Sequence, residues 1–183
     1  VFVADMPSVG YAVYDVRPSK KPGGSWAKVS VTEKSIENEC YRVSLNERGQ
    51  VASVFDRRLN KELLAAPIAL ELFYNKPGQW PAWEIQYEDL LAGPQAVVGE
   101  QSRIRVLEAG PVRGAIEVEQ QHGRSSFRTV IRLATGSDRL DFVTDIDWYE
   151  KESLLKAAFR FTSPNDSVTY DLGLGTIERG INT

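Results

Sequence analysis

The chain has 183 residues, 42% of them hydrophobic, which is enough to bury one core and a small appendage. Its 22 basic and 25 acidic residues are mixed along the whole length and give a net charge of -3, which argues against nucleic acid as a partner. No apolar run approaches the roughly 20 residues that a membrane-spanning helix needs, so no membrane partner is expected.

Two features mark the N-terminal region. The stretch GYAVYDV (10–16) alternates as a strand does, and RPSKKPGGS (17–25) has the proline, glycine and lysine of an exposed connector. We therefore predict that residues 1–25 are a strand and linker from a preceding small β module and that 26–183 form the main domain. The chain lacks an initiating methionine and stops directly after a patterned stretch, so we expect a piece of a longer protein, truncated at the C-terminus.

Alternation of apolar and polar residues dominates the main domain. Hairpins are predicted around the turns at 46–49, 109–111 and 135–138. The run LLKAAFRF fits a strand better than a helix, and the helix candidate NKELLAAPIALEL is broken by Pro67. Many short strands with frequent turns predict an all-β fold, a large antiparallel β-sandwich that a cut at the C-terminus would leave incomplete.

The stretch LDFVTDIDWYE concentrates acidic residues, and a pair of carboxylates is what a glycosidase needs. Alternation puts Asp141, Asp145 and Asp147 on one strand face, at a spacing that an inverting glycosidase would accept. The facing strand of the predicted hairpin presents Arg128 and Arg132 beside them. Because arginines would hold these carboxylates ionised, we favour an ion-paired strand face over a catalytic pair.

The chain has little material for a metal site or a nucleophilic triad. It has one histidine, His122, in a predicted surface turn, and one cysteine, Cys40, which also leaves the cellular compartment open. No serine lies in a G-x-S-x-G context, and the GLG motif at 173–175 is interpreted as turn or bulge glycines. We expect no metal and no cofactor to be bound by this chain.

The stretch LFYNKPGQWPAWEIQY (72–87) is the most unusual one, since it carries five aromatic residues and two prolines and does not alternate. Aromatic loops on a β scaffold often carry function, and tryptophan faces are surfaces on which sugars stack. The alternative is a loop folded back over the sandwich edge, with Trp80 and Trp83 filling a gap. The composition does not choose between these two interpretations.

Five blocks resemble the region after the catalytic domain in α-mannosidases of glycoside hydrolase family 38. The resemblance runs from about Ile36 to Thr183 and is carried by IENECYRVSLNERGQVASVFDRRLNKELL, LFYNKPGQWPAWEIQY, GPVRGAIEV, DIDWYEKESLLKAAFRF and VTYDLGLGTIERGINT. The resemblance implies a sandwich of the galactose-mutarotase type (a supersandwich) and a parent enzyme that hydrolyses α-mannosides with retention. Within it, Asp147, Trp148 and Glu150 are expected to fix a strand and its corner.

The resemblance also implies that zinc and both catalytic aspartates belong to an α/β barrel that is absent from this chain. The sandwich is then expected to be inactive alone, to buttress the barrel and to meet the α-mannoside glycan at the cleft. Its best candidate for the cleft is Arg179, and the second is the aromatic loop with Tyr74, Trp80, Trp83 and Glu84. Two alternatives stay open, an independent carbohydrate-binding module and a structural or interaction sandwich without sugar chemistry.

Overall fold

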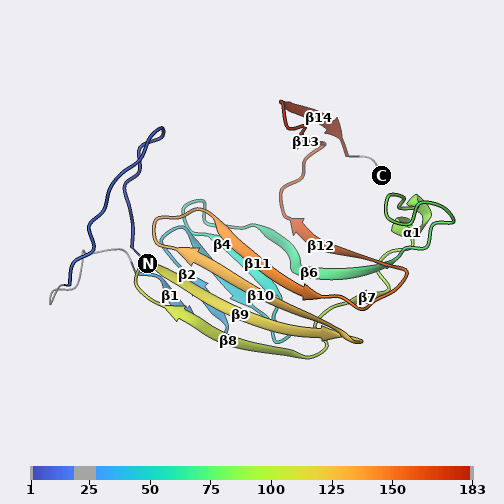
Figure 1. Ribbon diagram of the computed structural model, residues 1–183, viewed down its shortest axis with the longest axis horizontal. Coiled ribbons are helices and arrows are strands. Elements are labelled where there is room, and N and C mark those ends of the chain that lie inside the picture. Colours follow the sequence, from blue (N-terminus) through green and yellow to red (C-terminus); the bar gives the residue numbers. More distant parts are fainter. Residues whose placement is uncertain (1, 19–27, 182–183) are drawn as a thin grey trace.

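The computed structural model describes residues 2–18 and 28–181. Most of the second range is β-strand, and all the strand pairs are antiparallel. Figure 1 shows the strands stacked as layers, which confirms the predicted all-β antiparallel sandwich.

The strands form four groups. A five-stranded sheet contains, in spatial order, β1 (Ser30–Thr32), β2 (Ser35–Glu37), β3 (Tyr41–Leu45), β4 (Val51–Asp56) and β5 (Lys61–Glu62). A four-stranded sheet contains β11 (Leu140–Asp147), β10 (Ser125–Ala134), β9 (Arg113–His122) and β8 (Ser102–Ala109). A three-stranded sheet contains β12 (Ser153–Phe161), β6 (Leu64–Tyr74) and β7 (Ala96–Val97). The strands β13 (Ser167–Asp171) and β14 (Thr176–Gly180) pair only with each other, and the one helix of the described chain is α1 (Tyr87–Leu91).

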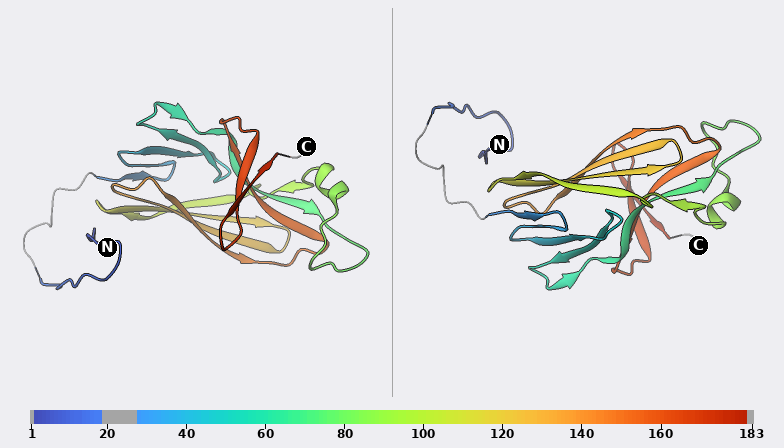
Figure 2. Two further views of the ribbon diagram at one scale, coloured as in Figure 1. Left: turned by 90° about the horizontal axis from the view of Figure 1, so that it is seen from above. Right: turned by 90° about the horizontal axis from the view of Figure 1, so that it is seen from below.

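The core lies between the four-stranded sheet and the other layer. Figure 2 shows these two layers from opposite sides. Its main cluster joins residues of β2, β3 and β4 with residues of β9 and β10, namely Ile36, Val43, Leu45, Val51, Val54, Ile116, Val118, Ile131 and Leu133. A second cluster joins Leu72 of β6, Val98 and Phe127 of β10. The inner face of the four-stranded sheet is thus covered in part by β1–β5 and in part by the three-stranded sheet.

The three predicted hairpins are confirmed, because β3–β4, β8–β9 and β10–β11 pair around the expected turns. The run LLKAAFRF is a strand, as predicted, within β12. Pro67 lies inside β6, between the pairs Ala66–Arg160 and Ala69–Ala158, where the register with β12 shifts. A bulge is one of the few places in a sheet that tolerates a residue without an N–H donor.

The strand predicted at 10–16 is not formed in this chain, since residues 2–18 contain no β-strand. Most of the predicted connector, from residue 19 onward, lies outside the described residues. The assignment of 1–25 to a preceding β module and of 26–183 to the sandwich therefore stays a prediction. In the described ranges, none of the helical structure has the length and apolar character that a membrane span requires.

Candidate functional site

Arg179 lies on β14, in a hairpin that projects from the layers of the molecule (Figure 1). The register pairs Arg179 with Val168 and Ile177 with Tyr170, so these four side chains share one face. The other face carries Ser167, Thr169 and Glu178. A hollow of about 610 Å³ is lined mainly by the first face.

This apolar face of the hairpin is open to solvent. Tyr170 is 50% exposed and Ile181, directly after β14, is 53% exposed. Among the described residues the guanidinium of Arg179 has no ion pair and no hydrogen-bond partner. The glycines of the predicted GLG turn connect the strands, and Gly173 adopts a φ of 80°, which favours glycine.

The aromatic loop is shorter than its sequence suggests, because Tyr74 ends β6 and Tyr87 begins α1. Its centre is a tight turn, in which the backbone N–H groups of Trp83 and Glu84 both donate to the carbonyl oxygen of Trp80, at 2.8 and 2.9 Å. Trp80 has a φ of 55°. This turn brings Trp80 and Glu84 to the rim of a shallow hollow of about 570 Å³.

Neither tryptophan of this loop fills a gap in the chain. The side chain of Trp80 is 65% exposed and that of Trp83 is 83% exposed, so the packing alternative is wrong for the described residues. Tyr74 and Trp83 do not line the hollow that Trp80 and Glu84 share. The hairpin rises from the layers beyond the end of β12, whereas the aromatic loop lies beside α1 at one end of the molecule (Figures 1 and 2).

The acidic strand β11 has the ion-paired face that its pattern predicts. Arg128 and Arg132 lie opposite Asp145 and Asp141 in the register. The Arg128 Nη1 donates to Asp145 at 3.1 Å, and Arg139 pairs with Asp141 at 2.8 Å. Both carboxylates are therefore ion-paired with arginines on the surface of the sheet.

The end of this strand forms a corner that Trp148 and Glu150 fix, as predicted for these two residues. The hydroxyl of Ser125 donates to Glu150 Oε1 at 2.9 Å and accepts from the backbone N–H of Tyr149 at 2.9 Å. Trp148 packs edge-on against Phe127, with ring centroids 6.3 Å apart. Through Ser125, Glu150 thereby links the segment before β12 to the first residue of β10.

The described residues contain no cluster of three or more histidine, cysteine, aspartate or glutamate side chains that fits a metal ion. His122 ends β9 at a surface turn, as predicted, and Cys40 is buried in the first sheet. The residues present therefore do not fit the zinc ion that the resemblance implies for the parent enzyme.

A buried carboxylate that the sequence analysis missed lies on the outer face of the four-stranded sheet. Glu117 is 0% exposed, and its oxygens accept hydrogen bonds from the Nε of Arg105 and, at 2.6 Å, from the Nε of Arg128. Burial raises the pKa of Glu117, but the hydrogen bonds from Arg105 and Arg128 outweigh it and hold the pKa below its ordinary value. The only signal in the sequence was the alternation of arginine and glutamate in neighbouring strands.

These features define a class, a β-sandwich domain that presents an exposed arginine hairpin and an exposed aromatic loop. Residues 36–183 match the model of the glycosyl hydrolases family 38 C-terminal domain. The chain is 22% identical over 194 residues to alpha-mannosidase G of Dictyostelium discoideum, which covers 95% of this chain and 18% of that protein. It is 25% identical over 183 residues to alpha-mannosidase 2C1 of Homo sapiens, with the same 95% and 18% coverage.

Because the family model covers most of its length, this chain belongs to the glycosyl hydrolase family 38 C-terminal domain family, as the resemblance indicated. The chain spans 18% of the length of these curated relatives.

Proposed function

We propose that this chain is the non-catalytic β-sandwich part of a zinc-dependent retaining α-mannosidase, which buttresses the catalytic barrel and lines the cleft for an α-mannoside glycan. The observation that carries the proposal is the exposed apolar face of the β13–β14 hairpin with Arg179 in it. Family membership supports the same role, and the relatives are named as α-mannosidases.

A two-stranded hairpin is marginally stable in water unless another surface covers its apolar face. Within the described chain, Val168, Tyr170 and Ile177 have no second layer of strands against them. A neighbouring domain of the parent enzyme would supply that layer. Arg179 would then lie at the border between the two domains, where its guanidinium donates hydrogen bonds to oxygens of the cleft or of the glycan.

Exposed apolar side chains on β11 and β12 support the buttressing role. Phe159 and Phe161 of β12 stack on each other with centroids 6.4 Å apart and remain largely exposed. Ile146 of β11 is also exposed, although Leu140 and Phe142 on the same face of the strand pack against the core. Apolar side chains that gather at one surface mark a contact with another part of a protein.

We assign the chemistry of hydrolysis to the rest of the parent enzyme. In the described chain, Asp141 and Asp145 are paired with arginines, and Glu150 is bound to Ser125. Such ion pairs and hydrogen bonds are typical of carboxylates that stabilise the fold. The chain's own contribution is therefore the position of Arg179 and of the aromatic loop.

The experiment for the non-catalytic role uses the purified 183-residue chain with an aryl α-mannoside in zinc buffer. The expected result is no hydrolysis above the buffer rate, with or without zinc. Hydrolysis that scales with protein concentration, and persists after further purification, would refute the non-catalytic role.

A second candidate function is favoured by the exposure of Trp80 and Trp83, which could hold a sugar without a barrel. Titration of the chain with mannose oligosaccharides, followed by tryptophan fluorescence, separates the two functions. A buttressing domain shows little change, whereas a binding module shows a saturable change that a Trp80→Ala, Trp83→Ala variant loses.

A further inference from the structure

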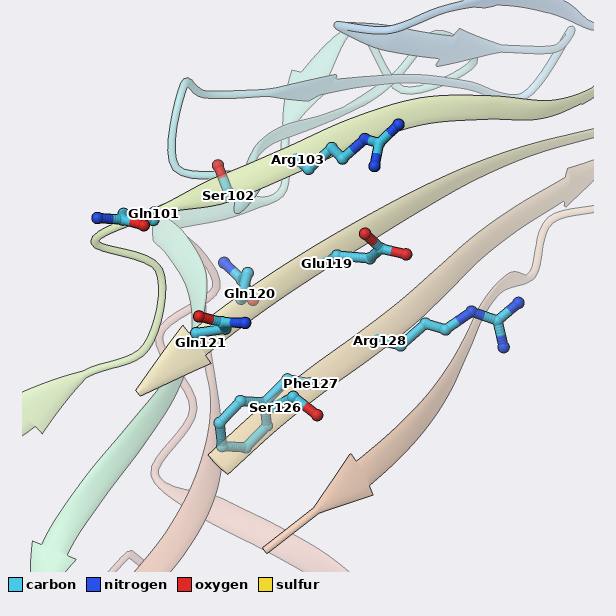
Figure 3. A pocket seen from close by; sticks show the side chains of 9 residues that line it. All are labelled: Gln101, Ser102, Arg103, Glu119, Gln120, Gln121, Ser126, Phe127 and Arg128. Carbon is cyan, nitrogen blue, oxygen red and sulfur yellow. The ribbon is translucent and has the colours of Figure 1, made fainter. Parts of the chain in front are cut away.

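The outer face of the four-stranded sheet has a hollow of about 450 Å³ that neither Arg179 nor the aromatic loop touches. It crosses β8, β9 and β10 near the turn that joins β9 to β10. Its polar lining consists of Gln101, Arg103, Glu119, Gln121, Ser126 and Arg128 (Figure 3).

The strand register brings these side chains together. Arg103 and Arg128 both lie opposite Glu119, on either side of the central strand, and Figure 3 shows the Glu119 side chain between them. Ser126 lies opposite Gln121. Side chains alternate along a strand, so Glu119 and Gln121 share the outer face, whereas Gln120 and Phe127, which also line the hollow, are buried.

Several of these groups have no partner in the protein. Among the described residues, the side chains of Gln101, Arg103, Gln121 and Ser126 make no hydrogen bond or ion pair. Together they offer two primary amides, a guanidinium and a hydroxyl, which provide both donors and acceptors. Pockets that recognise a ligand commonly place a few convergent polar groups in a hollow of this size.

The charges of the hollow are balanced. Arg128 is held by the buried Glu117 at 2.6 Å and by Asp145 at 3.1 Å, so its side chain is fixed and its charge is compensated. The carboxylate of Glu119 lies between Arg103 and Arg128 (Figure 3) and pairs with Arg105 at 3.5 Å. A carboxylate in the lining disfavours anions.

We propose that this hollow is a second binding site, for a neutral polyhydroxylated ligand such as a segment of a glycan. Sugar hydroxyls donate and accept hydrogen bonds at once, which matches the mixture of carboxylate, amide and guanidinium groups. Fixing Arg128 through Glu117 before the ligand arrives lowers the entropy cost of binding. The site goes beyond the proposed function, because it needs neither Arg179 nor a catalytic barrel.

The test is a titration of the ¹⁵N-labelled 183-residue chain with an α-linked mannotriose, followed by two-dimensional NMR. The expected result is a saturable set of shifts in 101–103, 119–121 and 126–128. Arg103→Ala should weaken binding about tenfold, the loss expected for a hydrogen bond to a charged group, and Gln121→Ala should weaken it by a smaller factor. Arg139→Ala, which removes an exposed arginine at the other end of this sheet, should leave the affinity unchanged.

Three results would overturn the proposal. One is the absence of shifts at the highest soluble concentration of the trisaccharide. Another is a set of shifts confined to the loop with Trp80 and Trp83. The third is competition by inorganic sulfate at equal concentration, which would make the hollow an anion site. None of these results bears on hydrolysis, so failure here is distinguishable from failure of the proposed function.

Discussion

Glu117 accepts a hydrogen bond from the Nε of Arg128 at 2.6 Å while its own side chain is inaccessible to solvent. Arg105 donates to the other oxygen from the strand on the opposite side. The outer face of the four-stranded sheet is thus held together by one carboxylate that joins three strands.

We expect Glu117→Gln to lower the free energy of unfolding by about 1–3 kcal/mol, because it removes two charge-assisted hydrogen bonds and leaves two arginines without a counter-charge. Urea unfolding at neutral pH measures this change. Asp145→Asn is the matched control, since Asp145 is bound to the same Arg128 but is 71% exposed, and it should cost about 0.5 kcal/mol or less. Equal effects of the two substitutions would contradict the role given to Glu117.

The same carboxylate predicts a dependence of stability on pH. The pKa of Glu117 in the folded protein lies below its ordinary value of 4.5, so the contribution to stability is complete above pH 4.5. It is lost as the pH falls through the folded pKa and the carboxylate becomes protonated. Urea midpoints measured at neutral pH and below pH 4.5 should therefore differ less for Glu117→Gln than for the wild type. A difference of the same size in both proteins would contradict the prediction.

Much of the fold could be predicted because its strands alternate and its hairpins are local. The register of β10 and β11 pairs Arg128 with Asp145 and Arg132 with Asp141, which follows directly from period-two alternation around one turn. Local pairing of this kind needs no knowledge of the other sheets.

The parts of the fold and of the site that could not be predicted depend on contacts between strands far apart in the sequence. Burial of Glu117 depends on the order β8, β9, β10, which alternation within each strand does not reveal. The sequence left two interpretations of the aromatic loop open. The exposure of Trp80 depends on how the loop after β6 lies against the layers, and the loop sequence alone does not determine that. The short helix α1 was also missed, since five residues carry no helical period.

Asn38 predicts a second stability effect, because its buried amide makes four hydrogen bonds. It donates to the carbonyl oxygens of Ala134 and Ser137 at 2.7 and 2.8 Å, and its oxygen accepts from the N–H groups of Cys40 and Tyr41 at 2.9 and 2.8 Å. Asn38→Ala should cost about 2–4 kcal/mol, since several buried groups lose their partners. Thermal unfolding measures the loss.

The control for Asn38 is Asn165→Ala, in an exposed connecting segment, with an expected change within about 0.5 kcal/mol. If Asn38→Ala unfolded at the same temperature as this control, the hydrogen bonds of Asn38 to the β10–β11 turn would contribute nothing to stability.

Gly114 of β9 lies in close contact with residues of and before β1. A Cβ atom there would lie 2.3 Å from Val31 Cγ2 and 2.9 Å from Val29 Cγ1, which is too close for any real contact. Gly114→Ala should therefore destabilise the protein by about 1–3 kcal/mol through overpacking. Gly110→Ala, whose nearest neighbour would be 3.6 Å away, is the control that should have a much smaller effect.

The central claim is tested most directly by the kcat/KM of the parent enzyme on an aryl α-mannoside after Arg179→Ala. We expect a fall of about tenfold to a hundredfold with an unchanged melting temperature, the loss expected for one hydrogen bond from a charged group in the transition state. Thr169→Ala, on the polar face of the same hairpin, should leave kcat/KM unchanged. An unchanged kcat/KM in Arg179→Ala would contradict the claim that this hairpin reaches the cleft.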